Sequence, residues 1–141
     1  MTKLLVPVDG SESSQRAVEY VRGLAKRGPR LEIELLNVQI PIVSGDIRRF
    51  VTQAMIDDYQ RLESEDALNP AKRMLEQGGV PYKATMLVGH TAETIADYAR
   101  KNGCEGIVMG TRGMGPMKNL VLGSVATQVI HAAEVPVTLV K

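Results

Sequence analysis

Short runs of aliphatic residues alternate along the whole chain with segments in which apolar side chains recur every three or four positions. The short runs are typical of strands buried in a sheet, and the longer period is typical of amphipathic helices. Their alternation predicts βαβ units and therefore a parallel sheet. The predicted strands are residues 3–8, 32–38, 82–88, 106–110 and 135–140.

Three of the segments between strands carry clear signals for the start and the end of a helix. The first follows Ser11 or Ser13, either of which can cap it, and ends at Gly28-Pro29. Another spans residues 91–103, and the last helix ends at about Ala133. The residues expected to face the core are Ala17, Val18, Val21, Leu24 and Ala25 in the first of these helices, and Ala92, Ile95, Ala96 and Ala99 in the second.

The segment between the second and third predicted strands is the longest connection. Residues 39–45 are expected to form a loop, and a helical pattern follows as far as Gly78-Gly79. Pro70 interrupts that pattern and marks either a kink or the cap of a second helix. The predicted apolar stripe consists of Ile47, Phe50, Val51, Ala54, Met55 and Leu62, continued by Leu68, Ala71 and Leu75.

The complete pattern predicts an α/β fold, namely a single-domain doubly wound sandwich over residues 1–141 with five parallel strands and helices on both faces. In such sheets ligands bind beyond the carboxyl ends of the strands, where the strand order reverses. We therefore expect the functional site after the first and fourth strands, at Asp9 and at the glycine-rich stretch Gly110–Ser124.

The stretch Gly110–Ser124 joins the fourth strand to a helix and has glycines near both of its ends. Glycine lets the backbone approach a ligand closely, and a helix N-terminus adds partial positive charge, so the combination suits phosphate. The stretch is neither a P-loop, G-x-x-x-x-G-K-[ST], nor the dinucleotide motif G-x-G-x-x-G. A simple flexible turn is the alternative, and Arg112 and Lys118 either screen a polyphosphate or are merely solvated.

The other candidate residues have structural alternatives. Asp9 binds a ligand hydroxyl or a metal, or else closes an Asx-turn with the two residues that follow it. His90 and His131 lack metal-ligand spacing and are interpreted as structural, and the acidic residues within 57–66 as a charged helix face. Because no nucleophile or general base stands out, we predict no catalytic residue and at most slow hydrolysis of a bound nucleotide.

Composition excludes several classes of function. The chain has 17 basic and 16 acidic residues, a net charge of +1 and no basic block, which argues against nucleic acid and membrane surfaces as partners. No stretch approaches ~18 uninterrupted apolar residues, so no membrane span is expected. The lone Cys104 cannot form an internal disulfide, which favours the cytoplasm, and it is interpreted as a small structural residue.

Three motifs resemble those of the universal stress protein family. Gly110, Gly113, Gly123 and Ser124 meet the signature G-x2-G-x9-G-[ST] in full. The sequence Val-Asp-Gly-Ser at residues 8–11 is similar to the opening motif of the family, and residues 135–140 are similar to its last strand. The resemblance covers essentially the whole chain and points to the ATP-binding type of member.

The resemblance implies the strand order 3-2-1-4-5 and ATP, with Mg²⁺, between the ends of the first and fourth strands. It also implies that the nucleotide acts as a conformational or assembly signal in a stress response. By this resemblance Asp9 contacts the ribose, Val38 meets adenine, and Pro7 and Val8 line the same wall. The remaining implied contacts are Met109, Gly110, Arg112 and Gly113 along the ribose and α-phosphate, and Gly123, Ser124 and Val125, through their amides and the Ser124 hydroxyl, at the outer phosphates.

One departure from the family pattern keeps an alternative open. Where members commonly read Gly-Leu-Ser-Gly-Leu, this chain reads Gly-Met-Gly-Pro-Met at residues 113–117, so position 115 has no hydroxyl and Pro116 has no N–H. The alternative is a dimeric interaction protein of the same fold that holds no nucleotide. An adenylating pyrophosphatase is disfavoured, because residues 9–14 do not read Ser-Gly-Gly-x-Asp-Ser.

The resemblance further implies a homodimer joined through the fifth strand, residues 135–140. The residues themselves point the same way, because Val135, Val137 and Leu139 would form an apolar edge strand. Pro136 is tolerable only at such an edge.

Overall fold

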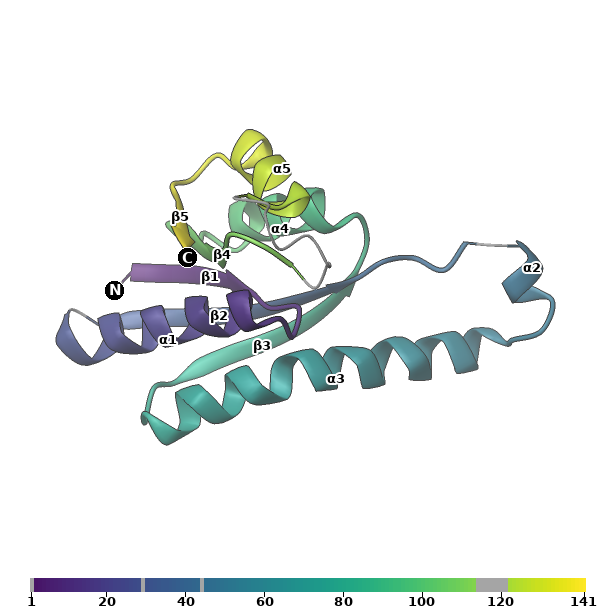
Figure 1. Cartoon of the computed structure of the whole chain (residues 1–141), viewed down its shortest axis with the longest axis horizontal. Helices are drawn as coiled ribbons and strands as arrows, with labels where there is room; N and C mark the ends of the chain where they lie inside the picture. Colours follow the sequence, from purple (N-terminus) through teal and green to yellow (C-terminus); the bar gives the residue numbers. More distant parts are fainter. Residues whose placement is uncertain (1, 29, 44, 114–121) are drawn as a thin grey trace.

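A computed structural model describes residues 2–28, 30–43, 45–113 and 122–141 of the chain. Its five strands form one parallel sheet in the order β3-β2-β1-β4-β5, which confirms the predicted fold class and strand order (Figure 1). The strands are β1 (Thr2–Pro7), β2 (Leu31–Gln39), β3 (Tyr82–Val88), β4 (Gly106–Gly110) and β5 (Val137–Val140). β5 begins two residues later than predicted, after Pro136, whose carbonyl accepts a bond from the amide of Ile107 at 2.9 Å.

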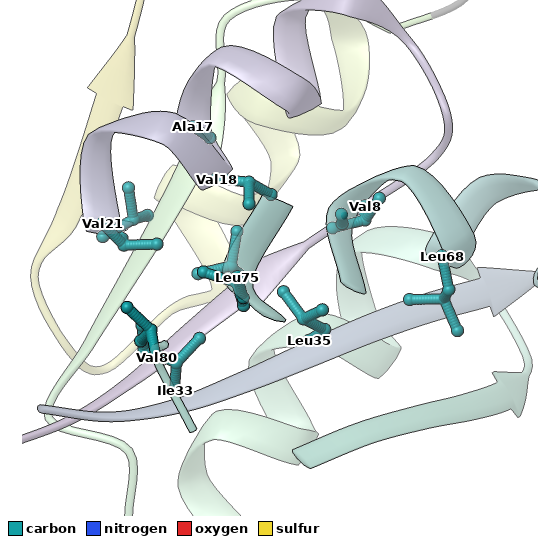
Figure 2. Packing of buried hydrophobic residues seen from close by; sticks show 12 residues of the cluster. Val8, Ala17, Val18, Val21, Ile33, Leu35, Leu68, Leu75 and Val80 are labelled. Carbon is teal, nitrogen blue, oxygen red and sulfur yellow. The ribbon is translucent and has the colours of Figure 1, made fainter. Parts of the chain in front are cut away.

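Helices cover both faces of the sheet, as the pattern predicted (Figure 1). Alternate residues of a strand point to opposite faces, so Val6 joins the apolar cluster under α1 and α3, and Leu5 joins the cluster under α4 and α5. Figure 2 shows the first cluster, in which side chains of the two helices meet those of β2. The helices are α1 (Glu12–Arg27), α2 (Gly45–Arg48), α3 (Gln53–Gln77), α4 (Thr91–Lys101) and α5 (Ser124–Ala132).

The start and the end of α1 follow from its sequence. The Ser11 hydroxyl accepts a hydrogen bond from the Ser14 amide at 3.1 Å, and Gly28 ends the helix with its amide bound to the Leu24 carbonyl at 3.0 Å. The predicted face is buried at Ala17, Val18 and Val21, which are fully inaccessible, while Leu24 and Ala25 are half-buried. In α4 the predicted residues Ala92, Ile95 and Ala99 are buried and Ala96 is half-buried.

α3 is one continuous helix of 25 residues that passes through Pro70. Its second half packs on the sheet with Leu68, Ala71 and Leu75 buried, as predicted. A proline inside a helix costs about 3 kcal/mol. Burial of the neighbouring aliphatic side chains, roughly 1.5–3 kcal/mol for each large one, offsets this cost. Because the helix is continuous, Pro70 is not the cap of a second helix.

The predicted stripe at the other end of this segment is wrong. Ile47, Phe50, Ala54, Met55 and Leu62 are exposed, Phe50 by 83%, and Val51 is half-buried. Figure 1 shows the reason: α2 and the start of α3 extend past the ends of the strands, where the described chain offers no apolar surface to cover them. The buried side chains of this half of α3 are Ile56, Gln60 and Ser64 instead.

Candidate functional site

All eleven residues predicted for the site line one cavity of about 780 Å³. The cavity lies at the carboxyl ends of β1, β2 and β4. The strand order reverses at β1, because β2 and β3 follow on one side of it and β4 and β5 on the other, and this is where ligands bind in sheets of this type. Its volume is within the ~300–1,000 Å³ typical of small-molecule sites. The eleven residues are Pro7, Val8, Asp9, Val38, Met109, Gly110, Arg112, Gly113, Gly123, Ser124 and Val125.

One wall of the cavity is formed by the ends of β1 and β2. The Val8 amide donates to the Leu36 carbonyl at 2.8 Å, and the side-chain amide of Asn37 donates to the Val8 carbonyl at 2.8 Å. Gln39 in turn donates to Asn37 Oδ1 at 2.7 Å. The bonds to Val8 join the end of β1 to the end of β2, and the apolar side chains of Val8 and Val38 line the cavity there.

Asp9 follows β1 and is exposed at the cavity. Its Oδ1 accepts a bond from the Ser11 amide at 2.9 Å, so the Asx-turn considered from the sequence is confirmed. Gly10 has a positive φ of 85°, which glycine adopts without strain. The other oxygen, Oδ2, lies 3.1 Å from the position that a Cβ on Gly113 would occupy. The first βα turn and the glycine-rich stretch therefore meet across the cavity.

The end of β4 is held against α1. The Arg112 amide donates to the Ser13 hydroxyl at 3.2 Å, and Gly110 packs directly on the backbone of Ser13. The glycine at position 110 is needed because a side chain there would collide with the helix.

Gly123 closes the other end of the glycine-rich stretch onto the same segment. Its amide donates to the Thr111 carbonyl at 2.6 Å, and a Cβ at this position would lie 3.3 Å from both that oxygen and the Arg112 Cα. The amide of Gly123 is thus already engaged, contrary to the expectation that it faces a phosphate. Its bond instead fixes the position of the start of α5.

The N-terminus of α5 opens onto the cavity without a side-chain cap. Within the described residues, the amides of Ser124, Val125 and Ala126 have no acceptor, and the first bond of the helix runs from the Thr127 amide to the Gly123 carbonyl at 3.0 Å. Unpaired amides and the helix dipole together attract anions. α1 differs, because Ser11 caps its first turn.

Sequence reasoning missed several residues of the cavity. They come from the turn after β1, the starts of α1, α4 and α5 and the end of β2, which the parallel topology brings to the same edge of the sheet. Asn37 could have been noticed as an amide within an aliphatic strand. The missed residues are Gly10, Ser11, Glu12, Ser13, Ser14, Arg16, Leu36, Asn37, Thr91, Ile95 and Ala126. The segment with Gly115, Pro116 and Lys118 lies outside the described residues.

The histidines and the acidic helix face stay apart from this cavity. His90 and His131 are exposed, at the start of α4 and in the last turn of α5, and neither lines the cavity. No group of three or more metal-binding side chains occurs in the ranges that the structure covers. None of the described helices is long and apolar enough to cross a membrane.

A second polar group is buried between the sheet and α4, outside the cavity. The Glu34 carboxyl is 3% exposed and accepts a bond from the Tyr98 hydroxyl at 2.6 Å, and Lys3 Nζ lies 3.4 Å from its other oxygen. Cys104 is buried beside it, with Sγ 4.0 Å from Glu34 Oε2, in agreement with a structural role. Burial and the neighbouring Glu34 carboxyl raise the pKa of this thiol to about 11. An unreactive thiol is the consequence.

Comparison with known proteins agrees with this architecture over the full chain. Residues 1–141 match the profile of the universal stress protein family. The universal stress protein MJ0531 of Methanocaldococcus jannaschii is 32% identical over 99% of this chain and 81% of its own length. The solved structure of MJ0577, a universal stress protein of the same organism, superposes with a TM-score of 0.83 at 28% identity and covers 99% of this chain and 95% of that one.

Two further solved structures of the same fold contain nucleotides. A universal stress protein family member from Arabidopsis thaliana with AMP bound has a TM-score of 0.69 at 22% identity, with 100% of this chain and 92% of that one covered. The universal stress protein from Archaeoglobus fulgidus in complex with dAMP has a TM-score of 0.69 at 22% identity, with 100% and 98% covered. The sequence profile, the relative and the shared fold agree, and the chain belongs to the universal stress protein family.

Proposed function

We propose that the cavity binds an adenine nucleotide, specifically ATP with Mg²⁺, and that the bound nucleotide serves as a conformational or assembly signal in a stress response. The observation that carries this proposal is the uncapped N-terminus of α5, whose amides open onto the same cavity as an apolar wall. A site with an apolar end and an anion-binding end suits a nucleotide. The AMP and dAMP held by two proteins of this fold support the choice of adenine.

In this proposal the base lies on the wall formed by Pro7, Val8 and Val38, and Asp9 Oδ2 accepts a bond from a ribose hydroxyl. Met109, Gly110, Arg112 and Gly113 follow the ribose and the α-phosphate. The outer phosphates lie at the amides of Ser124 and Val125 and at the Ser124 hydroxyl, while Gly123 contributes the close backbone packing that sets the position of these groups.

The charged residues of the cavity fit a magnesium ion that arrives with the phosphates. Asp9 is assigned to the Asx-turn and the ribose, so Glu12 is the carboxylate of the lining that would be left for the ion, and Mg²⁺ in nucleotide sites takes one or two carboxylates together with phosphate oxygens. When bound, the ion would supply positive charge to the polyphosphate. The absence of a larger carboxylate or histidine cluster among the described residues fits an ion held mainly by the nucleotide.

We propose binding rather than rapid hydrolysis as the main activity. The described lining of the cavity contains no histidine, cysteine, lysine or tyrosine, so a general base would have to be Asp9 or Glu12. Asp9 is already engaged by one oxygen in its Asx-turn. Turnover is therefore expected to be slow.

We also propose a homodimer through the β5 edge, within residues 135–140. β5 pairs only with β4 among the described strands, so its other edge is open, and Val137 and Leu139 are half-buried there. Pairing with a second copy would satisfy the open backbone groups. Light scattering after gel filtration tests this directly: a monomer at micromolar concentration would contradict it. A cytoplasmic location stays a prediction from the lone Cys104.

Nucleotide extraction separates the proposed function from a dimeric interaction protein without nucleotide. Purified protein is denatured, the supernatant is chromatographed for adenine nucleotides, and ATP with Mg²⁺ is then titrated by calorimetry. We expect a co-purified nucleotide or a saturable heat of binding. No nucleotide in the supernatant and no heat at millimolar ATP would favour the interaction protein. Fast, magnesium-dependent release of phosphate would instead indicate an enzyme.

A further inference from the structure

Arg16 lines the cavity from the second turn of α1 and has no bonded partner in the described structure. Its side chain is half-buried, and the hydrogen bonds and ion pairs of the described residues include none made by its guanidinium group. Glu12, one turn earlier, lines the same cavity but forms no ion pair with Arg16 within those residues. A positive charge at the cavity is therefore left for a ligand.

The position of Arg16 on α1 indicates which end of the cavity it serves. Residues three apart on a helix are surface neighbours, so Arg16 lies on the same side of α1 as Ser13. Ser13 contacts Gly110 and accepts the bond from the Arg112 amide. Arg16 therefore lies on the side of α1 that faces Gly110 and Arg112, where the phosphates are proposed to lie.

The N-terminus of α1 does not offer unpaired backbone amides to an anion as the N-terminus of α5 does. The Ser14 amide is taken up by the Ser11 hydroxyl at 3.1 Å, and the Ser11 amide by Asp9 Oδ1 at 2.9 Å. The side chain of Arg16 is thus the feature of α1 best suited to an anion, because a guanidinium group binds phosphate through two parallel hydrogen bonds.

We infer that Arg16 binds the outer phosphates of the nucleotide and makes the site selective for a nucleoside triphosphate over a monophosphate. This inference rests on the proposed nucleotide function and adds to it the residue that discriminates by phosphate number. A monophosphate would occupy only the α-phosphate position along Gly110 to Gly113, next to Ser13 on α1, and in this inference it does not contact the guanidinium group of Arg16, one turn further along the helix. The β- and γ-phosphates extend beyond that position and gain one charge-assisted contact.

The test compares ATP and AMP affinities in Arg16→Gln, Arg16→Lys and a matched control, Arg27→Gln. Arg27 is on the same helix, carries the same charge, and is exposed outside the cavity. Affinities are measured by calorimetry on the full chain with Mg²⁺ for ATP. We expect Arg16→Gln to weaken ATP binding about 10- to 100-fold, the value of one hydrogen bond to a charged group. AMP binding should change by less than about twofold, and Arg16→Lys should recover part of the loss because it keeps the charge.

The outcomes separate this inference from the proposed function beneath it. Equal losses of ATP and AMP affinity in Arg16→Gln would overturn the inference, because they indicate a structural effect on the whole site. Unchanged ATP affinity would also overturn it and leave the proposed function standing. Wild-type protein that binds neither nucleotide would refute the proposed function itself. Thermal unfolding of each variant checks the fold, and Arg16→Lys provides the comparison if Arg16→Gln is unstable.

Discussion

Gly110 at the end of β4 packs so closely on Ser13 in α1 that a Cβ on Gly110 would overlap the Ser13 hydroxyl. The same Cβ would lie 2.6 Å from the backbone carbonyl of Ser13, which no rotation of a side chain can relieve. The two residues come from helix and strand ends far apart in the sequence. Their contact, with the bond from the Arg112 amide to the Ser13 hydroxyl, holds the end of β4 against α1 at the cavity.

Gly110→Ala is expected to destabilise the protein and to weaken nucleotide binding. The added methyl group must push α1 away from β4, and overpacking of this kind costs about 1–3 kcal/mol. Urea denaturation measures the free energy of unfolding, and calorimetry measures the affinity for ATP. Gly45→Ala is the control, because a Cβ there meets nothing within 4 Å. A Gly110→Ala protein as stable as the wild type would contradict the packing described.

Gly123→Val is expected to abolish ATP binding while the protein stays folded. A Cβ at Gly123 lies 3.3 Å from backbone atoms of Thr111 and Arg112, so a branched side chain displaces that segment from the start of α5. Gly123 contributes no side chain to the two apolar clusters, so circular dichroism should retain the wild-type spectrum. The ATP affinity of Gly123→Ala should lie between those of the wild type and Gly123→Val. Unchanged ATP affinity in Gly123→Val would refute the phosphate site proposed at α5.

Tyr98→Phe is expected to lower stability without changing nucleotide affinity. The substitution leaves the buried Glu34 carboxyl without its 2.6 Å hydrogen bond, and an unsatisfied buried group costs about 1–3 kcal/mol. Tyr82→Phe is the control, since the bond from Tyr82 to Glu76 is exposed and its loss costs little. Chemical denaturation of both variants makes the comparison. Equal, small losses of unfolding free energy in Tyr98→Phe and Tyr82→Phe would show that the buried hydrogen bond to Glu34 contributes no more than a surface bond.

The free energy of unfolding is expected to fall as pH rises from 9 to 12. Burial, with the nearby Glu34, raises the pKa of Cys104 from 9.0 to about 11, and the hydrogen bond to Glu76 raises the pKa of Tyr82 from 10.0 to about 12. Both groups are neutral when protonated, and the unfolded chain ionises first. Below pH 9 neither group changes the free energy of unfolding. Above pH 9 that free energy decreases until the pH exceeds the pKa values that the two groups have in the folded protein.

Urea unfolding at a series of pH values measures this slope, and Cys104→Ala should flatten its part between pH 9 and 11. The same raised pKa predicts slow labelling of Cys104 by thiol reagents at pH 8, because little thiolate is present in the folded protein. Labelling of the native protein as fast as that of the denatured chain would contradict the burial of Cys104.

The fold could be predicted largely because each element carries its own signals. The run of aliphatic residues before Asp9 forms β1, Ser11 caps the start of α1, and α1 ends at Gly28. The spacing of Gly110, Gly113, Gly123 and Ser124 identified four residues that line the cavity. The prediction that the apolar stripe around Phe50 packs on the core was wrong for a different reason. Helical periodicity shows which face of a helix is apolar, but it does not show where the sheet beneath that face ends.

The sequence alone determined the order of strands and helices, the edge of the sheet where the cavity lies and the glycines that allow close backbone packing there. Tertiary structure decided which groups remain available at that edge. In the folded chain the amide of Gly123 bonds to the Thr111 carbonyl, and the start of α5 has no side-chain cap. Folding also places Asn37 and Arg16 in the lining of the cavity. The physical reason is that side-chain patterns are local, whereas a hydrogen-bond partner or an unpaired charge depends on distant segments that meet only in the folded chain.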